Sequence, residues 1–186
     1  MTGRHIPNIL TLFRVVLVVP IAVSLLEGRP LTTLVLFALA GITDGLDGYL
    51  ARRFNWQSRL GGILDPLADK ILLLVVYCVL GWMTLLPVWL VVAVVLRDVV
   101  IVSGFLVYQV RISQVDTAPL LVSKFNTVLQ IGLVLLVVLA QVGMSLPEWL
   151  LTGLIFAVLS TTVISGVGYV WVWSRKAIRH SDGSTS

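Results

Sequence analysis

The chain has 186 residues, of which 58% are hydrophobic and only 12% are charged. Soluble domains carry about 25% charged residues, so this composition excludes a soluble globular protein and predicts an integral membrane protein. The formal net charge is +4, but no basic run alternates with aromatic residues, which argues against a nucleic-acid-binding protein.

Apolar segments fill most of the chain, and a helix needs about 20 apolar residues to cross roughly 30 Å of hydrocarbon. We expect six membrane spans, at residues 8–26, 31–53, 61–82, 85–108, 120–142 and 148–173. The fold class is therefore all-α: one membrane domain over residues 1–186, with six transmembrane helices in one bundle. Residues 174–186 are expected to form a flexible basic tail.

The first span contains Arg14 about two turns inside its apolar sequence. A charge at that depth is costly, so we expect Arg14 to have an ionic partner or access to the lipid headgroups. The third span contains the single cysteine, Cys78, which we expect to be packed like a hydrophobic side chain.

Four aspartates lie where the second span ends and the third begins. Asp44 and Asp47 are three residues apart, and Asp65 and Asp69 are four apart, so each pair points to one side of a helix. Such carboxylates repel one another unless a cation lies among them, and hard oxygen ligands suit a divalent metal. The pattern predicts a metal site for Mg²⁺ or Mn²⁺.

The basic residues predict the orientation in the membrane. One side would carry Arg4, Arg52, Arg53, Arg59, Arg111, Arg175, Lys176 and Arg179, and the other side only Arg29. Cytoplasmic segments carry the excess of lysine and arginine. We therefore expect both termini and the acidic cluster at the cytoplasmic side of a multi-pass protein in the inner membrane of a bacterium.

The acidic stretch as a whole resembles the signature of the CDP-alcohol phosphatidyltransferases. The matching positions are Asp44, Asp47, Gly48, Ala51, Arg52, Gly61, Asp65 and Asp69. This resemblance implies a homodimeric enzyme that transfers a phosphatidyl group from CDP-diacylglycerol to an alcohol with release of CMP, in phospholipid synthesis. It implies six helices, with the motif on the second and third.

The resemblance also implies roles for individual residues. The four aspartates would bind the divalent metal, and Asp69 would in addition act as the general base for the acceptor hydroxyl. The nucleotide of the donor would contact Asp44, Gly48, Ala51, Arg52 and Gly61. A narrower interpretation of Asp65 is that it caps a helix that begins at Pro66, but capping does not explain the other three aspartates.

Two acceptors stay open, because two subfamilies share the motif. The fifth span contains VSKFNTVLQ, which resembles the cardiolipin synthases, and Phe105 stands where glycerophosphate enzymes have an arginine. We favour phosphatidylglycerol as the acceptor, with glycerol 3-phosphate as the alternative. The acceptor phosphate would contact Arg97 and Lys124, with Arg14 and Arg111 as further candidates.

Two other classes of membrane protein fit the sequence less well than an enzyme. A cation or proton transporter predicts carboxylates spread over the depth of the membrane and internal symmetry, and the sequence shows neither. An inactive membrane scaffold is disfavoured because every position of the motif is intact.

Overall fold

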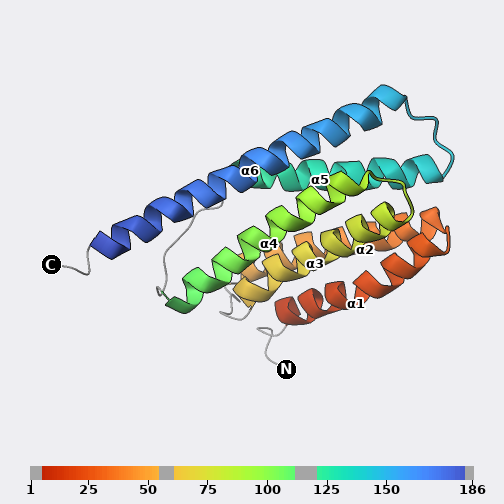
Figure 1. Cartoon of the computed structure of the whole chain (residues 1–186). Coiled ribbons are helices and arrows are strands. Elements are labelled where there is room, and N and C mark those ends of the chain that lie inside the picture. Colours follow the sequence, from red (N-terminus) through yellow and green to blue (C-terminus); the bar gives the residue numbers. More distant parts are fainter. Residues whose placement is uncertain (1–5, 55–60, 112–120, 183–186) are drawn as a thin grey trace. The chain divides into compact units, whose positions relative to one another are not determined.

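The computed structural model describes residues 6–54, 61–111 and 121–182, with side chains placed in 9–46, 53–54, 67–104 and 122–169. Within these ranges the chain forms helices and no strands (Figure 1). The helices are α1 (Ile6–Leu26), α2 (Pro30–Arg53), α3 (Gly61–Trp82), α4 (Val88–Arg111), α5 (Leu121–Gln141) and α6 (Glu148–Asp182). The predicted all-α class is confirmed for the described residues.

Proline and glycine mark several of the helix ends within the described residues. Pro30 opens α2, and Pro87 and Pro147 directly precede α4 and α6, where a residue without an N–H costs no helical hydrogen bond. Gly28 has a φ of 64° in the turn between α1 and α2, a conformation that side chains with a Cβ rarely adopt. These signals place the turns close to the expected positions.

The end of α6 differs from the sequence-based expectation. The sixth span was expected to end at residue 173, but α6 continues to Asp182. The added segment contains arginine, lysine and alanine, which are good helix formers even outside a membrane. The flexibility of residues 174–186 stays a prediction.

Three helical segments within the described residues are long and apolar enough to cross a membrane: Ile9–Leu26, Val122–Gln141 and Glu148–Tyr169. A shorter apolar segment runs over Pro30–Leu46 in α2. The protein therefore has membrane-spanning helices, whereas the full set of six spans and the side on which each terminus lies stay predictions.

The chain divides into two compact units. The first comprises Met1–Val88 and Val134–Pro147, and the second comprises Trp89–Leu133 and Glu148–Ser186. In the first unit α1 packs against both α2 and α3, around a core that includes Ile21, Ala40, Val76, Tyr77 and Leu80. This packing is what allows a side chain of α1 to reach the acidic motif. The expectation of a single domain over residues 1–186 stays a prediction.

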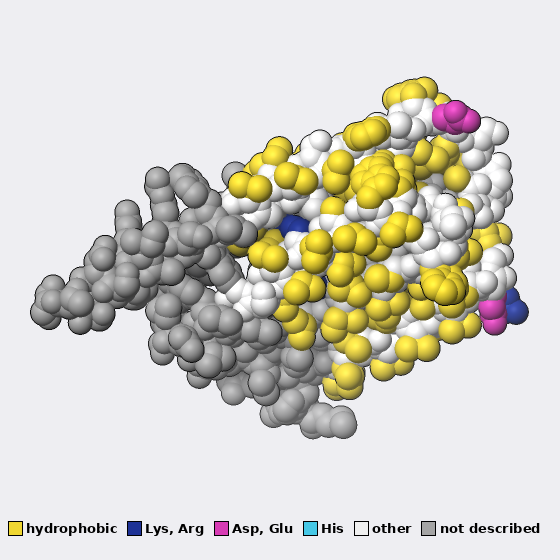
Figure 2. Space-filling view, in the orientation of Figure 1, with side chains coloured by type: hydrophobic (Ala, Val, Ile, Leu, Met, Phe, Trp, Pro, Cys, Tyr) yellow, Lys and Arg dark blue, Asp and Glu magenta, His cyan; other side chains and the backbone are white. Residues whose placement is uncertain are grey.

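Large apolar side chains are exposed on many helices, as expected for a surface that contacts lipid. Figure 2 shows hydrophobic side chains over much of the described surface in view, with charges only at isolated points. Cys78 belongs to this exterior: it is exposed on α3, so the prediction that it is packed was wrong. Apolar neighbours in a membrane helix do not indicate burial, because the lipid side is apolar as well.

Candidate active site: an acidic motif paired with a buried arginine

The helices α2 and α3 carry the acidic motif, as the sequence predicted. Asp44 lies on α2 and Asp69 on α3, and both side chains are partly exposed, at 46% and 43% respectively. Although 25 positions separate them in the sequence, their carboxylates meet at one guanidinium group. The structure thus brings together one aspartate from each half of the motif.

That guanidinium belongs to Arg14 of α1, whose side chain is only 1% exposed. Its Nη2 donates to Oδ1 of Asp44 at 2.7 Å, and its Nη1 donates to Oδ1 of Asp69. The planar fork of arginine can serve two carboxylates at once, and charged partners make these hydrogen bonds strong. The prediction that Arg14 needs an ionic partner is confirmed.

The other motif residues lie on the same two helices. Asp47, Gly48, Ala51 and Arg52 belong to α2, and Gly61 and Asp65 belong to α3. Their side chains lie outside the described set, so their predicted roles in metal and nucleotide binding stay predictions.

The chemistry of the donor set fits a divalent metal. Two carboxylates from different helices already converge on a positive charge. Asp47 and Asp65 follow and precede them by about one helical turn, which would add hard oxygen donors on the same helices. Among the side chains that the structure places, no three acidic, histidine or cysteine residues form a metal-binding group, and Asp47 and Asp65 are not among those side chains.

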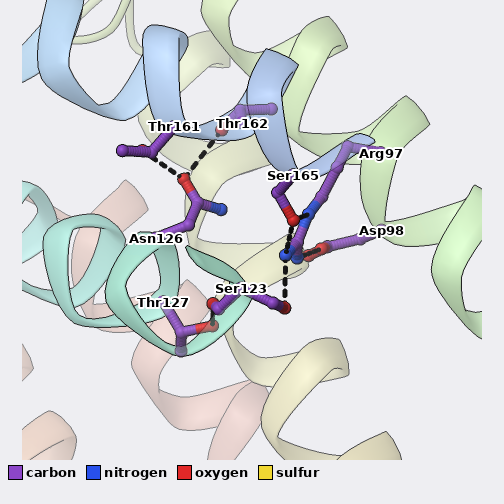
Figure 3. Close-up of polar contacts among 8 residues, drawn as sticks. All are labelled: Arg97, Asp98, Ser123, Asn126, Thr127, Thr161, Thr162 and Ser165. Atoms are coloured by element: carbon purple, nitrogen blue, oxygen red, sulfur yellow. Dashed lines mark hydrogen bonds and ion pairs between the residues drawn. The ribbon is translucent and has the colours of Figure 1, made fainter. Parts of the chain in front are cut away.

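A second polar cluster lies in the other unit, around Arg97 of α4 (Figure 3). Arg97 is buried and donates from Nη1 to Oδ1 of Asp98 at 2.6 Å. Its Nη2 donates to Oγ of Ser123 on α5 at 2.6 Å and to Oγ of Ser165 on α6 at 2.7 Å. One buried guanidinium therefore links α4, α5 and α6.

Two of these helices, α5 and α6, are also joined through the side-chain amide of Asn126. The hydroxyl groups of Thr161 and Thr162 on α6 donate to Oδ1 of Asn126 on α5, at 2.7 Å and 3.0 Å. Asn126 is fully buried, and within the described part of the chain its Nδ2 has no hydrogen-bond partner. Sequence reasoning missed these residues and both serines, although a polar side chain within an apolar span is itself a signal of an interhelical contact.

The remaining predicted acceptor contacts differ in exposure. Lys124 is exposed on α5, directly after Ser123, whereas Arg97 is enclosed by its hydrogen-bond partners. Arg111 is the last residue of α4, and its side chain is outside the described set. Arg14 lies in the first unit, bonded to the acidic motif. The acceptor-binding role of all four stays a prediction.

Comparison with known proteins assigns this architecture to a family. The sequence profile of the CDP-alcohol phosphatidyltransferases matches residues 4–170, which include both polar clusters. Cardiolipin synthase (CMP-forming) of Rattus norvegicus is 40% identical over 122 residues, covering 65% of this chain and 40% of that protein. Probable cardiolipin synthase (CMP-forming) of Drosophila melanogaster is 36% identical over 189 residues, covering 89% of this chain and 56% of that protein.

A relative with a different name matches as well. CDP-diacylglycerol--glycerol-3-phosphate 3-phosphatidyltransferase of Blochmanniella floridana is 38% identical over 109 residues, covering 53% of this chain and 55% of that protein. The chain thus spans about half the length of the curated relatives it matches. Because the family profile covers most of the sequence, the chain belongs to the CDP-alcohol phosphatidyltransferase family.

Proposed function

We propose that this protein transfers a phosphatidyl group from CDP-diacylglycerol to an alcohol acceptor, with release of CMP, in phospholipid synthesis. The observation that carries the proposal is the convergence of Asp44 and Asp69, from two helices, on one buried cation within the region that matches the family. The names of the relatives, which are synthases and phosphatidyltransferases of this class, support it.

In the proposed mechanism, Asp44, Asp47, Asp65 and Asp69 hold a divalent metal, Mg²⁺ or Mn²⁺. The bound ion supplies positive charge that offsets the negative charge of the pyrophosphate and of the departing CMP. Gly48 and Ala51 leave room for the nucleotide to approach α2, and Arg52 and Gly61 complete the donor contacts.

Asp69 accepts the proton of the acceptor hydroxyl in this mechanism. The acceptor oxygen then forms a bond to the lipid-side phosphorus, and the bond from that phosphorus to the oxygen of CMP breaks. Asp69 suits this role because its carboxylate is held in place by Arg14 yet is partly exposed. A base must combine both properties, since it needs a fixed position and access to the substrate.

For the acceptor we propose phosphatidylglycerol, with glycerol 3-phosphate as the alternative. The stretch VSKFNTVLQ and Phe105 favour the lipid acceptor, and the relatives named above carry names of both kinds. Lys124 is the acceptor contact that we favour, because its side chain is exposed. Arg97, Arg111 and Arg14 are retained as weaker candidates, since Arg97 and Arg14 already have partners in the protein.

The membrane arrangement that accompanies this function is also a proposal. Six spans, cytoplasmic termini and an active site at the cytoplasmic face of a bacterial inner membrane would place the acidic motif where a lipid-linked nucleotide can enter from the side. We further propose a homodimer, as expected from the resemblance to the family.

Product analysis by mass spectrometry tests the proposal directly. Purified protein in detergent would receive CDP-diacylglycerol and Mn²⁺ or Mg²⁺, with phosphatidylglycerol and glycerol 3-phosphate offered in parallel. We expect cardiolipin and CMP, and neither product when the metal is chelated. Phosphatidylglycerophosphate as the main product would reverse the choice of acceptor, and absence of CMP with both acceptors would refute the transferase.

A further inference from the structure

Arg14 lies outside the acidic motif, on α1, yet its ion pairs join one aspartate from each half of that motif. It is among the largest fully buried side chains of the described chain, and its ion pairs reach α2 through Asp44 and α3 through Asp69. A buried arginine that pairs with carboxylates on two different helices affects the packing of α1 and also the spacing of those two carboxylates. It fixes how the carboxylates of α2 and α3 approach each other.

The charges explain why such a residue is needed. Two carboxylates brought to one point repel each other, and the partial exposure of Asp44 and Asp69 lets water screen only part of that repulsion. The guanidinium places one nitrogen on each carboxylate, in both cases at Oδ1. A lysine could offset the charge but could not set the same spacing, because its ammonium is a point charge on a flexible stem.

We propose that Arg14 is the resident counter-ion of the acidic motif: a positioning residue that holds Asp44 and Asp69 together when no divalent cation is bound, and that shares this role with the metal when one binds. The inference rests on the proposed metal-dependent function. The proposal separates the charge of Arg14 from its packing, because a bound cation can compensate for a missing charge but not for missing side-chain contacts.

Thermal unfolding of the full chain in detergent tests the proposal. Wild type, Arg14→Met and Arg14→Lys would be melted in EDTA and in saturating Mn²⁺. Arg14→Met removes two charge-assisted hydrogen bonds, but the carboxylates left behind are 46% and 43% exposed and partly screened by water, so we expect the midpoint in EDTA to fall by about 4–8 °C. We expect Mn²⁺ to remove at least half of that difference, and Arg14→Lys to lie between the other two proteins.

Arg29→Met is the matched control, since Arg29 pairs with Glu27 at 3.2 Å but its side chain is 67% exposed. Exposed pairs contribute little, so its midpoint should stay within about 2 °C of wild type in both conditions. The double variant Arg14→Met with Asp44→Asn should melt above Arg14→Met in EDTA, because one of the repelling charges is gone. This comparison remains decisive if the single variant is poorly folded.

Three results would overturn the proposal. One is an equal difference between wild type and Arg14→Met with and without Mn²⁺, which would leave Arg14 a purely structural role. Another is a double variant no more stable than Arg14→Met in EDTA. The third is a wild-type midpoint that does not respond to Mn²⁺. Failure of the proposed function has a different signature, namely no CMP release by wild-type protein whose midpoint does respond to Mn²⁺.

Discussion

Replacement of Arg97 by methionine should destabilise the protein strongly. The change removes the guanidinium that lies 2.6 Å from Oδ1 of Asp98, while the Asp98 side chain stays only 3% exposed. Removing one partner of a buried ion pair typically costs about 3–5 kcal/mol, because the other charge is left in a poorly solvating environment. For a chain of this size each kcal/mol shifts the unfolding midpoint by about 2–4 °C, so we expect a fall of about 6–20 °C.

The same geometry predicts a rescue. Arg97→Met combined with Asp98→Leu removes both charges and fills the site with apolar side chains, so it should recover most of the lost stability. Replacement of Ser123 or Ser165, whose hydroxyl oxygens accept from Arg97, should cost less, because each change removes one neutral acceptor and leaves the ion pair of Arg97 with Asp98 in place.

Circular dichroism or tryptophan fluorescence during heating in detergent would measure these midpoints, with the exposed Lys124→Met as the control. A loss below about 1 kcal/mol in Arg97→Met, or a double variant no more stable than the single one, would refute the reasoning. An unchanged midpoint together with a raised KM for the acceptor would instead favour a direct contact between Arg97 and the acceptor.

Three further predictions concern the site and its surroundings. Asp69→Asn should abolish CMP release while CDP-diacylglycerol binding, measured with labelled lipid, stays within about 10-fold of wild type, because the other three metal-binding aspartates remain; lost binding would show that the metal contact of Asp69 is essential for holding the donor. Lys124→Ala should raise the KM for the acceptor more than the KM for the donor, and equal effects in steady-state assays would count against the acceptor contact. Thr162→Val removes a hydroxyl group that donates to Asn126 at 3.0 Å, so it should lower the midpoint by about 2–4 °C, whereas the exposed Thr152→Val should not.

The helices were largely predictable from the sequence because their limits have local causes. Proline and glycine mark the turns, and apolar length marks the helices between them. The extension of α6 to Asp182 was missed because the expected span counted only apolar residues, whereas the helical backbone continues into a basic segment. The thickness of the membrane sets the minimum length of a spanning helix, but it does not determine the residue at which the helix ends.

The partners of the buried charges were harder to predict. The need of Arg14 for a partner follows from the cost of a charge within an apolar helix, but the identity of the partners depends on how α1 packs on α2 and α3. Similarly, Ser123 and Ser165 are single hydroxyl residues in apolar helices, and no periodic pattern connects them with Arg97. Such contacts are properties of the packed helices and not of any one segment.

The ion pairs of Arg14 also bear on how the protein is made. Along the chain, α1 precedes the helices that carry Asp44 and Asp69, so the arginine is synthesised before either of its partners. Insertion of an arginine costs about 2.5–3.5 kcal/mol at the centre of a membrane helix on translocon scales, and less at the position of Arg14, which is nearer the start of the apolar segment Ile9–Leu26. The arrival of α2 and α3 offsets this cost, so a substitution at Asp44 or Asp69 should weaken the packing of α1 as well as catalysis.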